Sequence, residues 1–174
     1  PSADPFPFLL AAASRGNALV LTPALGSARA LGVRLRRSGV SVALLPRDWA
    51  VAAGGTTVVG ARAAAWAPMH GLAAVLVLDE HDEGYQEERT PTWHARDVAL
   101  ERARRAGVPC VLVSPCPTLE ALAWGTLLPP SRQAERHGWP MVDVVDRRKE
   151  DPGRAGLYSP LLVQRLRGEG RVVC

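Results

Sequence analysis

An uninterrupted apolar run at residues 73–78 (AAVLVL) constrains the fold of this chain more than any other feature. Six apolar residues without a polar interruption are typical of a strand that is buried on both faces of a parallel sheet. The run leads directly into four ionisable residues, 79–82 (DEHD). Ligands of open α/β sheets bind at the carboxyl ends of the strands, so the sequence predicts a functional site here. A charge run of this kind is equally typical of a solvated loop.

Short apolar runs alternate with helix-like stretches through most of the chain. Gly39 and Gly107 follow two of these stretches, in the position where glycine commonly ends a helix. Strands that alternate with helices indicate βαβ units, so we expect a three-layer α/β domain with a parallel sheet. The expected strands are 18–22, 41–45, 56–60, 73–78 and 110–114, and the expected helices are 7–15, 27–38 and 94–106.

Proline and glycine become frequent at residues 129–140, which indicates a boundary between two structural units. We expect residues 1–140 to form one lobe. Residues 141–174 are expected to open a second lobe, with a strand at 141–146, a helix at 159–166 and a strand at 171–174. The chain begins with Pro1 rather than Met, which suggests a trimmed chain.

Composition excludes several classes of protein. With 47% hydrophobic and 22% charged residues, the chain has enough apolar surface for a core, and disorder is not expected. No apolar stretch approaches the roughly 18 residues of a membrane span, and no signal peptide is visible, so we expect a cytoplasmic protein without a membrane partner. The three cysteines form no C-x-x-C pair, which argues against a zinc ribbon, and we expect buried free thiols.

The net charge of +4 is distributed unevenly along the chain. Residues 1–78 carry a net charge of +5, residues 79–101 carry −6, and residues 102–174 carry +5. An acidic segment between basic flanks suits a metal or polar site beside an anion-binding surface. All but one of the 21 basic residues are arginine, a bias that high-GC codon usage explains equally well.

Five motifs in order carry a family resemblance. Residues 58–68 (VVGARAAAWAP) are similar to V-I-G-T-R-S-A-L-F-A-P, and residues 78–85 (LDEHDEGY) to D-E-E-H-D-x-x-Y. Residues 93–99 (WHARDVA) are similar to Y-H-A-R-D-V-A, and residues 114–120 (SPCPTLE) are similar to S-A-T-P-S-L-E. Residues 144–173 resemble the segment that leads into the second lobe of the same family. These are motifs of the primosomal protein N′ family, the replication-restart DNA helicases of bacteria, in helicase superfamily two.

The resemblance implies a RecA-like helicase lobe of the P-loop NTPase type. It also implies ATP and Mg²⁺ as the family's cofactors, and DNA (forked or single-stranded) and other replication-restart proteins as partners. At an acid-rich strand end of this type, a carboxylate holds Mg²⁺ and a neighbouring residue orients water.

The chain departs from the family at the residues that handle ATP. It has no G-x-x-x-x-G-K-[ST] loop to cradle the phosphates. Leu78 stands at the position of the metal-holding aspartate, and only Asp79, Glu80 and His81 continue the acidic box, as we name residues 78–82. A one-residue deletion would move Asp79 to the metal position but would misplace Tyr85. We therefore expect a DNA-binding chain without ATP hydrolysis, with no intact catalytic residue, no bound cofactor and no metal.

The resemblance makes Arg62 the first candidate for a contact with a DNA phosphate, because guanidinium matches phosphate oxygens bidentately. An ordinary surface arginine is an equal alternative. The basic stretch of Arg34, Arg36 and Arg37 is a second, less certain DNA contact.

Aromatic and histidine residues of the motifs favour structural roles. We expect the tryptophans to pack in the core or between lobes rather than to stack on bases. His94 and Asp97 lie at i, i+3 spacing, so we expect them to pair with each other or with the acidic loop. The tryptophans considered are Trp66, Trp93, Trp124 and Trp139.

Two other functions stay open. One is an active ATP-dependent 3′–5′ DNA helicase whose phosphate loop lies upstream of Pro1, which the leucine at position 78 argues against. The other is a metal-dependent hydrolase, because His and Asp side chains at strand ends can hold divalent ions. Its candidate ligands are Asp79, His81, Asp82, His94 and Asp97.

Overall fold

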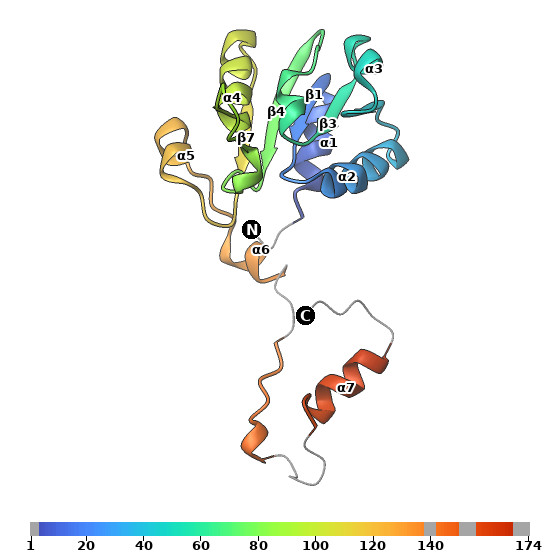
Figure 1. The fold of residues 1–174 in the computed structure, drawn as a ribbon, viewed down its shortest axis with the longest axis vertical. Coiled ribbons are helices and arrows are strands. Elements are labelled where there is room, and N and C mark those ends of the chain that lie inside the picture. The colour runs from blue at the N-terminus through green and yellow to red at the C-terminus, as the bar shows by residue number, and fades with distance from the viewer. Residues whose placement is uncertain (1–3, 138–141, 150–155, 169–174) are drawn as a thin grey trace. The chain divides into compact units, whose positions relative to one another are not determined.

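The computed structural model describes residues 4–137, 142–149 and 156–168, and Figure 1 shows their helices and strands. The chain divides into two compact units, Pro1–Trp139 and Pro140–Cys174. Their interpretation as two helicase lobes stays a prediction. No helix in the described ranges is long and apolar enough to cross a membrane.

The first unit is built on a five-stranded sheet. The strands are β1 (Asn17–Leu21), β2 (Val42–Leu44), β3 (Thr57–Gly60), β4 (Leu72–Leu78) and β7 (Cys110–Val113). Their order across the sheet is β2-β3-β1-β4-β7, and every neighbouring pair is parallel. All five strands lie where the apolar runs predict them, and the two parallel neighbours of β4 confirm the predicted α/β class.

Helices cover both faces of this sheet (Figure 1). The elements of the first unit are α1 (Phe6–Ser14), α2 (Leu25–Arg37), α3 (Trp49–Ala53), the 3₁₀ helix η1 (Arg62–Trp66), α4 (Ala95–Ala106), α5 (Leu119–Trp124) and α6 (Arg132–His137). α1 and α2 contribute to one apolar cluster, and α3, η1 and α4 contribute to the other. The unit therefore has the predicted three layers.

Each strand supplies both clusters, because successive side chains of a strand point to opposite faces of the sheet. In β1, Ala18 and Val20 belong to the cluster under α1 and α2. Leu19 and Leu21 belong to the cluster under α4, and all four side chains are fully buried. A run of apolar residues without alternation is what this two-sided burial requires.

The predicted helix ends at glycine are confirmed. Gly39 follows α2 with φ of 84°, and Gly107 ends α4 with φ of 65°. Glycine adopts this left-handed region without steric cost. The helix expected at 94–106 begins one residue later, at Ala95, because His94 is the N-cap of α4. The His94 ring accepts a hydrogen bond from the Arg96 N–H.

The segment after β4 folds into short elements that the apolar pattern does not predict. These are the 3₁₀ helix η2 (Glu83–Tyr85) and the strands β5 (Gln86–Glu87) and β6 (Trp93–His94). β5 and β6 pair antiparallel, with Gln86 opposite His94 and Glu87 opposite Trp93. An ion pair between Arg62 and Glu87 joins this hairpin to the start of η1.

The second unit contains the 3₁₀ helix η3 (Arg147–Lys149) and α7 (Pro160–Arg167) among its described residues. α7 confirms the predicted helix, and the Ser159 hydroxyl caps it by accepting a hydrogen bond from the Leu162 N–H at 3.1 Å. The predicted strand at 141–146 is wrong over residues 142–146, because these residues form no strand. Residue 141 and the predicted strand at 171–174 lie outside the described residues.

Candidate functional site

The acidic box begins where β4 ends, and its first three side chains enter three different environments. Leu78 is 5% exposed and packs in the apolar cluster under α1 and α2. Asp79 is exposed and has φ of 50°, a left-handed conformation that is uncommon outside glycine. Glu80 is buried again. The turn at Asp79 therefore directs one carboxylate to solvent and the next into the protein.

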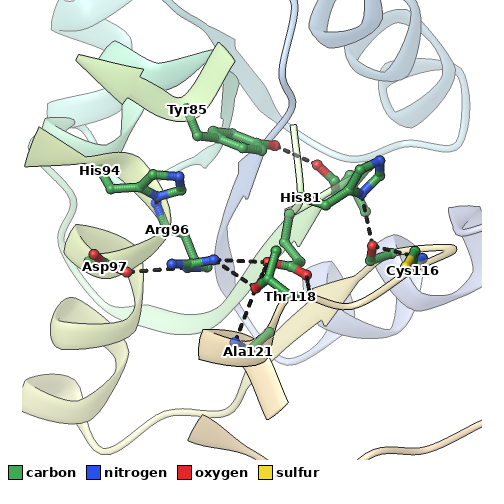
Figure 2. Close-up of polar contacts among 11 residues, drawn as sticks. His81, Tyr85, His94, Arg96, Asp97, Cys116, Thr118 and Ala121 are labelled. Carbon is green, nitrogen blue, oxygen red and sulfur yellow. Dashed lines mark hydrogen bonds and ion pairs between the residues drawn. The ribbon is translucent and has the colours of Figure 1, made fainter. Parts of the chain in front are cut away.

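The Glu80 carboxylate is fully engaged by protein groups, as the dashed contacts in Figure 2 show. Its Oε1 accepts the Thr118 N–H at 2.8 Å. Its Oε2 accepts the Thr118 hydroxyl at 3.0 Å and Arg96 Nη1 at 3.1 Å. Both side chains of the ion pair are buried, with 8% of Arg96 and none of Glu80 exposed. Glu80 thus holds neighbouring elements together instead of offering a free carboxylate.

Opposing influences set the protonation of this carboxyl. Burial raises the pKa of Glu80. The hydrogen bonds from Thr118 and the ion pair with Arg96 together lower it by more than burial raises it, so the net pKa lies below its ordinary value. A buried charge is tolerated only when it is paired and hydrogen-bonded. The ionised Glu80 therefore depends on Arg96 and Thr118.

These three residues connect three elements at the carboxyl edge of the sheet, the edge at which its parallel strands end. Glu80 follows β4, Arg96 lies in the first turn of α4, and Thr118 is the N-cap of α5, where its hydroxyl accepts the Ala121 N–H at 3.2 Å. Neither Arg96 nor Thr118 was predicted to have a role. Their only signal was membership of the family motifs at 93–99 and 114–120.

His94 and Asp97 each bind Arg96, and the contacts of the described residues include neither a pair between them nor a bond from either to the acidic loop. His94 Nδ1 accepts the Arg96 backbone N–H at 3.2 Å, and Asp97 Oδ1 accepts Arg96 Nε at 3.2 Å. Burial lowers the pKa of His94. This favours the neutral imidazole, which the cap requires because a protonated Nδ1 cannot accept.

A second contact joins the ends of β4 and β7. The Ser114 hydroxyl lies 2.8 Å from His81 Nδ1 and accepts the Cys116 N–H at 3.2 Å (Figure 2). Tyr85 also binds the end of β4, because its buried hydroxyl donates to the Leu78 carbonyl at 2.5 Å. Burial raises the pKa of Tyr85, which keeps it a neutral donor.

Free thiols occur in two environments. Cys110 is half-buried in β7, where burial raises the pKa of its thiol to about 12. Cys116 is exposed, so the expectation of a buried thiol is wrong there. Cys174 lies outside the described residues.

The carboxylates and imidazoles of the acidic region are not arranged as a metal site. Over the described part of the chain, no three His, Cys, Asp or Glu side chains are grouped so as to hold a metal ion. The Asp82 carboxylate instead caps η2 by accepting the Gly84 N–H at 2.7 Å. The geometry gives no support to the metal-dependent hydrolase alternative.

Arg62 lies at the carboxyl edge, directly after β3. Its Nη2 is 3.0 Å from Glu87 Oε2, and its Nη1 donates to the Gln86 carbonyl. A cleft of about 360 Å³ opens beside this pair, and its walls are mostly apolar. Lining residues include Pro23, Leu25, Leu45 and Trp93.

The other candidate DNA contacts lie in the last turn of α2. α2 runs from the carboxyl end of β1 back toward the amino end of β2, so its last turn carries them away from Arg62. Arg34 pairs with Asp4, and Arg36 pairs with Asp48. Arg37 is exposed and has no ion-pair partner among the described residues. The structure does not bring the four arginines into one surface.

Trp93 packs against the apolar cluster under α4, as expected for a tryptophan of the core. Trp66 is 58% exposed and Trp124 is 51% exposed, so neither packs in the core of the first unit. Trp93 is half-buried and meets Trp66 edge-on, with ring centroids 5.4 Å apart and an interplanar angle of 70°. Trp139 lies outside the described residues.

No protein-family model matches the chain. Replication restart protein PriA of Bacillus subtilis (strain 168) is 36% identical over 115 residues, which are 63% of this chain and 14% of that protein. The same protein of Treponema pallidum (strain Nichols) is 37% identical over 117 residues, 63% of this chain and 17% of the relative. That of Chlamydia pneumoniae is 41% identical over 78 residues, 43% of this chain and 10% of the relative.

The chain therefore spans 10% to 17% of the length of these curated relatives. The resemblance read from the motifs is confirmed at this level: a segment of about 115 residues in this chain is homologous to replication restart protein PriA.

Proposed function

We propose that this chain is a DNA-binding segment of a replication-restart, helicase-like protein, and that the chain itself does not hydrolyse ATP. Homology to replication restart protein PriA supports the role in replication restart. The resemblance to the restart helicases adds DNA, forked or single-stranded, and other restart proteins as partners. On the same grounds we assign the first unit to a RecA-like lobe and the second to the opening of a following lobe.

The state of the strand end after β4 carries the proposal. Phosphoryl transfer needs a cradle for the phosphates and a carboxylate-held Mg²⁺ that neutralises developing charge. Leu78 is apolar and buried, so it offers no oxygen ligand. Asp79 turns to solvent, and Glu80 is bound to Arg96 and Thr118. The residues present do not fit Mg²⁺ and ATP, which also disfavours the alternative of an active helicase.

The acidic box then has a structural role in place of a catalytic one. Glu80 ties β4 to α4 and α5, and His81 ties it to the end of β7. The carboxyl edge is thereby held rigid, and Arg62 stands on this edge beside an open cleft. A rigid edge that carries an arginine suits a sequence-independent contact with the DNA backbone.

DNA binding is expected to be weak and steep in salt, because phosphate contacts act through counterion release. Arg62→Ala should weaken binding to a labelled oligothymidine strand about fivefold, the effect of a net loss of about 1 kcal/mol. It should also lower the slope of log affinity against log salt by about 0.7, the value for one lost contact to a single strand. A fluorescence-anisotropy titration over a series of salt concentrations measures both quantities.

Arg15→Ala is the matched control. Arg15 is exposed and follows α1 at the amino edge of the sheet, so this variant removes the same charge at a distance from Arg62. Affinity that does not change with salt, or an equal loss in both variants, contradicts the assignment of Arg62.

A further inference from the structure

The guanidinium of Arg62 already has two acceptors from the protein. Its Nη2 pairs with Glu87 Oε2 at 3.0 Å, and its Nη1 donates to the Gln86 carbonyl. A bidentate contact with a phosphate uses two neighbouring N–H groups of this kind. The side chains of Arg62 and Glu87 are 35% and 23% exposed, so the pair lies at the surface with one side open.

The hairpin holds Glu87 in the position that meets Arg62. Glu87 Oε1 accepts the Arg89 N–H at 3.1 Å, so the carboxylate oxygen that does not meet Arg62 is bound within the hairpin. The Glu87 backbone pairs with Trp93 across β5 and β6. Trp93 in turn contacts Trp66, the last residue of η1, whose first residue is Arg62. The β5–β6 hairpin and η1, which are joined by the contact between Trp93 and Trp66, therefore place Glu87 beside Arg62.

We propose that Glu87 acts as a built-in competitor, which occupies the Nη2 group of Arg62 until a phosphate oxygen of single-stranded DNA displaces it. The proposal rests on the proposed function, since it takes Arg62 as a DNA contact. Glu87 Oε2 offers Nη2 an anionic oxygen acceptor, as a phosphate oxygen does. Glu87 thus fills the place of the ligand when DNA is absent.

The surroundings of the pair allow this exchange. Arg62 and Glu87 both stand in the wall of the cleft of about 360 Å³, so a phosphate can approach the guanidinium from solvent. Partly exposed ion pairs contribute little and are screened by salt, which makes the carboxylate a weak competitor. The segment 79–101 carries a net charge of −6 and repels an isolated anion. The ligand that displaces Glu87 is therefore a phosphate group within a DNA strand, which other contacts between that DNA strand and the protein hold in place.

Substitution of Glu87 tests the competition in the full chain. Binding of a fluorescein-labelled oligothymidine strand is measured by anisotropy at about 50 mM and about 200 mM salt, the range over which phosphate contacts change most. Glu87→Gln is expected to bind about threefold more tightly than the unchanged chain, within the range of a lost exposed ion pair. Glu88→Gln is the matched control, because Glu88 is the exposed neighbour and the change in net charge is the same.

A second variant separates the contact from the charge. Glu87→Asp keeps the negative charge but shortens the side chain by one methylene, so it weakens the pair with Arg62 at constant net charge. It is expected to bind DNA more tightly than the unchanged chain, whereas Glu88→Asp is expected to leave binding as it is. In an Arg62→Ala background, the Glu87 substitutions should raise affinity no more than the matching Glu88 substitutions, because no guanidinium is released.

Each outcome decides the proposal. A gain in the Glu87 variants that exceeds the gain in the Glu88 variants and disappears with Arg62→Ala supports it. Equal effects at positions 87 and 88, with DNA binding intact, overturn the competition and leave the proposed function standing. An excess gain at position 87 over position 88 that persists without Arg62 also overturns it. Absence of DNA binding in every variant and in the unchanged chain overturns the competition and the proposed function together.

Discussion

Arg96→Met is expected to lower the free energy of unfolding by about 3–5 kcal/mol, the cost of leaving one partner of a buried ion pair uncompensated. Glu80 is fully buried, and Arg96 is its only cationic partner among the described residues. Thr118 would keep its two hydrogen bonds to the carboxylate but cannot supply a charge. Urea unfolding followed by tryptophan fluorescence measures the loss.

Asp97→Asn provides the matched control for this variant. Asp97 binds the same guanidinium from outside, and its side chain is 58% exposed. Its contribution should be below about 1 kcal/mol, as for other exposed pairs. Adding Glu80→Gln to Arg96→Met should recover part of the lost stability, because no buried charge then stays unpaired. An Arg96→Met variant that loses no more than Asp97→Asn would show that the buried pair is not a main support of the carboxyl edge.

The same experiment has a pH dependence of known sign. The pKa of Glu80 is lowered in the folded chain, so its contribution is fully present above the ordinary carboxyl pKa. This contribution is lost as the pH falls through the lowered pKa of the folded state. The difference between the unchanged chain and Arg96→Met should therefore shrink in acid.

Tyr85→Ala is expected to have a similarly large effect, about 3–5 kcal/mol, as for other large aromatic side chains removed from a core. Tyr85 is fully buried in the cluster under α4, and its hydroxyl binds the Leu78 carbonyl at the end of β4. The variant therefore loses apolar contacts and the anchor that holds η2 against the strand end. Thermal and urea unfolding measure the change.

Tyr85→Phe separates these two contributions. It keeps the ring and removes only the donor, which leaves the Leu78 carbonyl unsatisfied at a cost of about 1–3 kcal/mol. The phenylalanine variant should therefore retain more stability than the alanine variant. Equal losses in the two variants would contradict a packing role for the ring and place the whole effect in the hydrogen bond.

The sheet was predictable because its strands are buried on both faces. Residues 73–78 and 18–22 are apolar at every successive position but one, which is the pattern of a strand that is buried on both faces. The glycines at 39 and 107 fixed two helix ends for the steric reason given above. The predicted strand at 141–146 failed over residues 142–146 because no partner strand lies beside them among the described residues, and Val142 and Val144 are 78% and 92% exposed.

The hairpin and the buried ion pair were not predictable from periodicity. β5 and β6 have two residues each, too few to show alternation, and they lie in an acidic segment typical of loops. Arg96 is charged and follows the pattern of a solvent-facing helix position. It is buried because Glu80 and Thr118 reach it from distant parts of the sequence. Such pairing between distant residues leaves no local signal.

The site was predictable in place but not in its contacts. The carboxyl end of β4 is where the chemistry-bearing residues gather, as the rule for parallel sheets requires. Whether each carboxylate faces solvent or protein depends on the left-handed turn at Asp79, which the acidic run does not specify. Arg62 reached the expected edge, whereas its partner Glu87 came from the unpredicted hairpin.

Phosphate release from ATP tests the central claim most directly. The full chain is incubated with ATP and Mg²⁺, with and without single-stranded DNA, and inorganic phosphate is measured over time; Leu78→Asp is carried through the same assay. We expect no release above the uncatalysed rate in either protein, because Leu78→Asp restores a metal ligand but not the phosphate-binding loop. Mg²⁺-dependent release by the unchanged chain that single-stranded DNA stimulates would contradict this account and identify the chain as part of an active helicase.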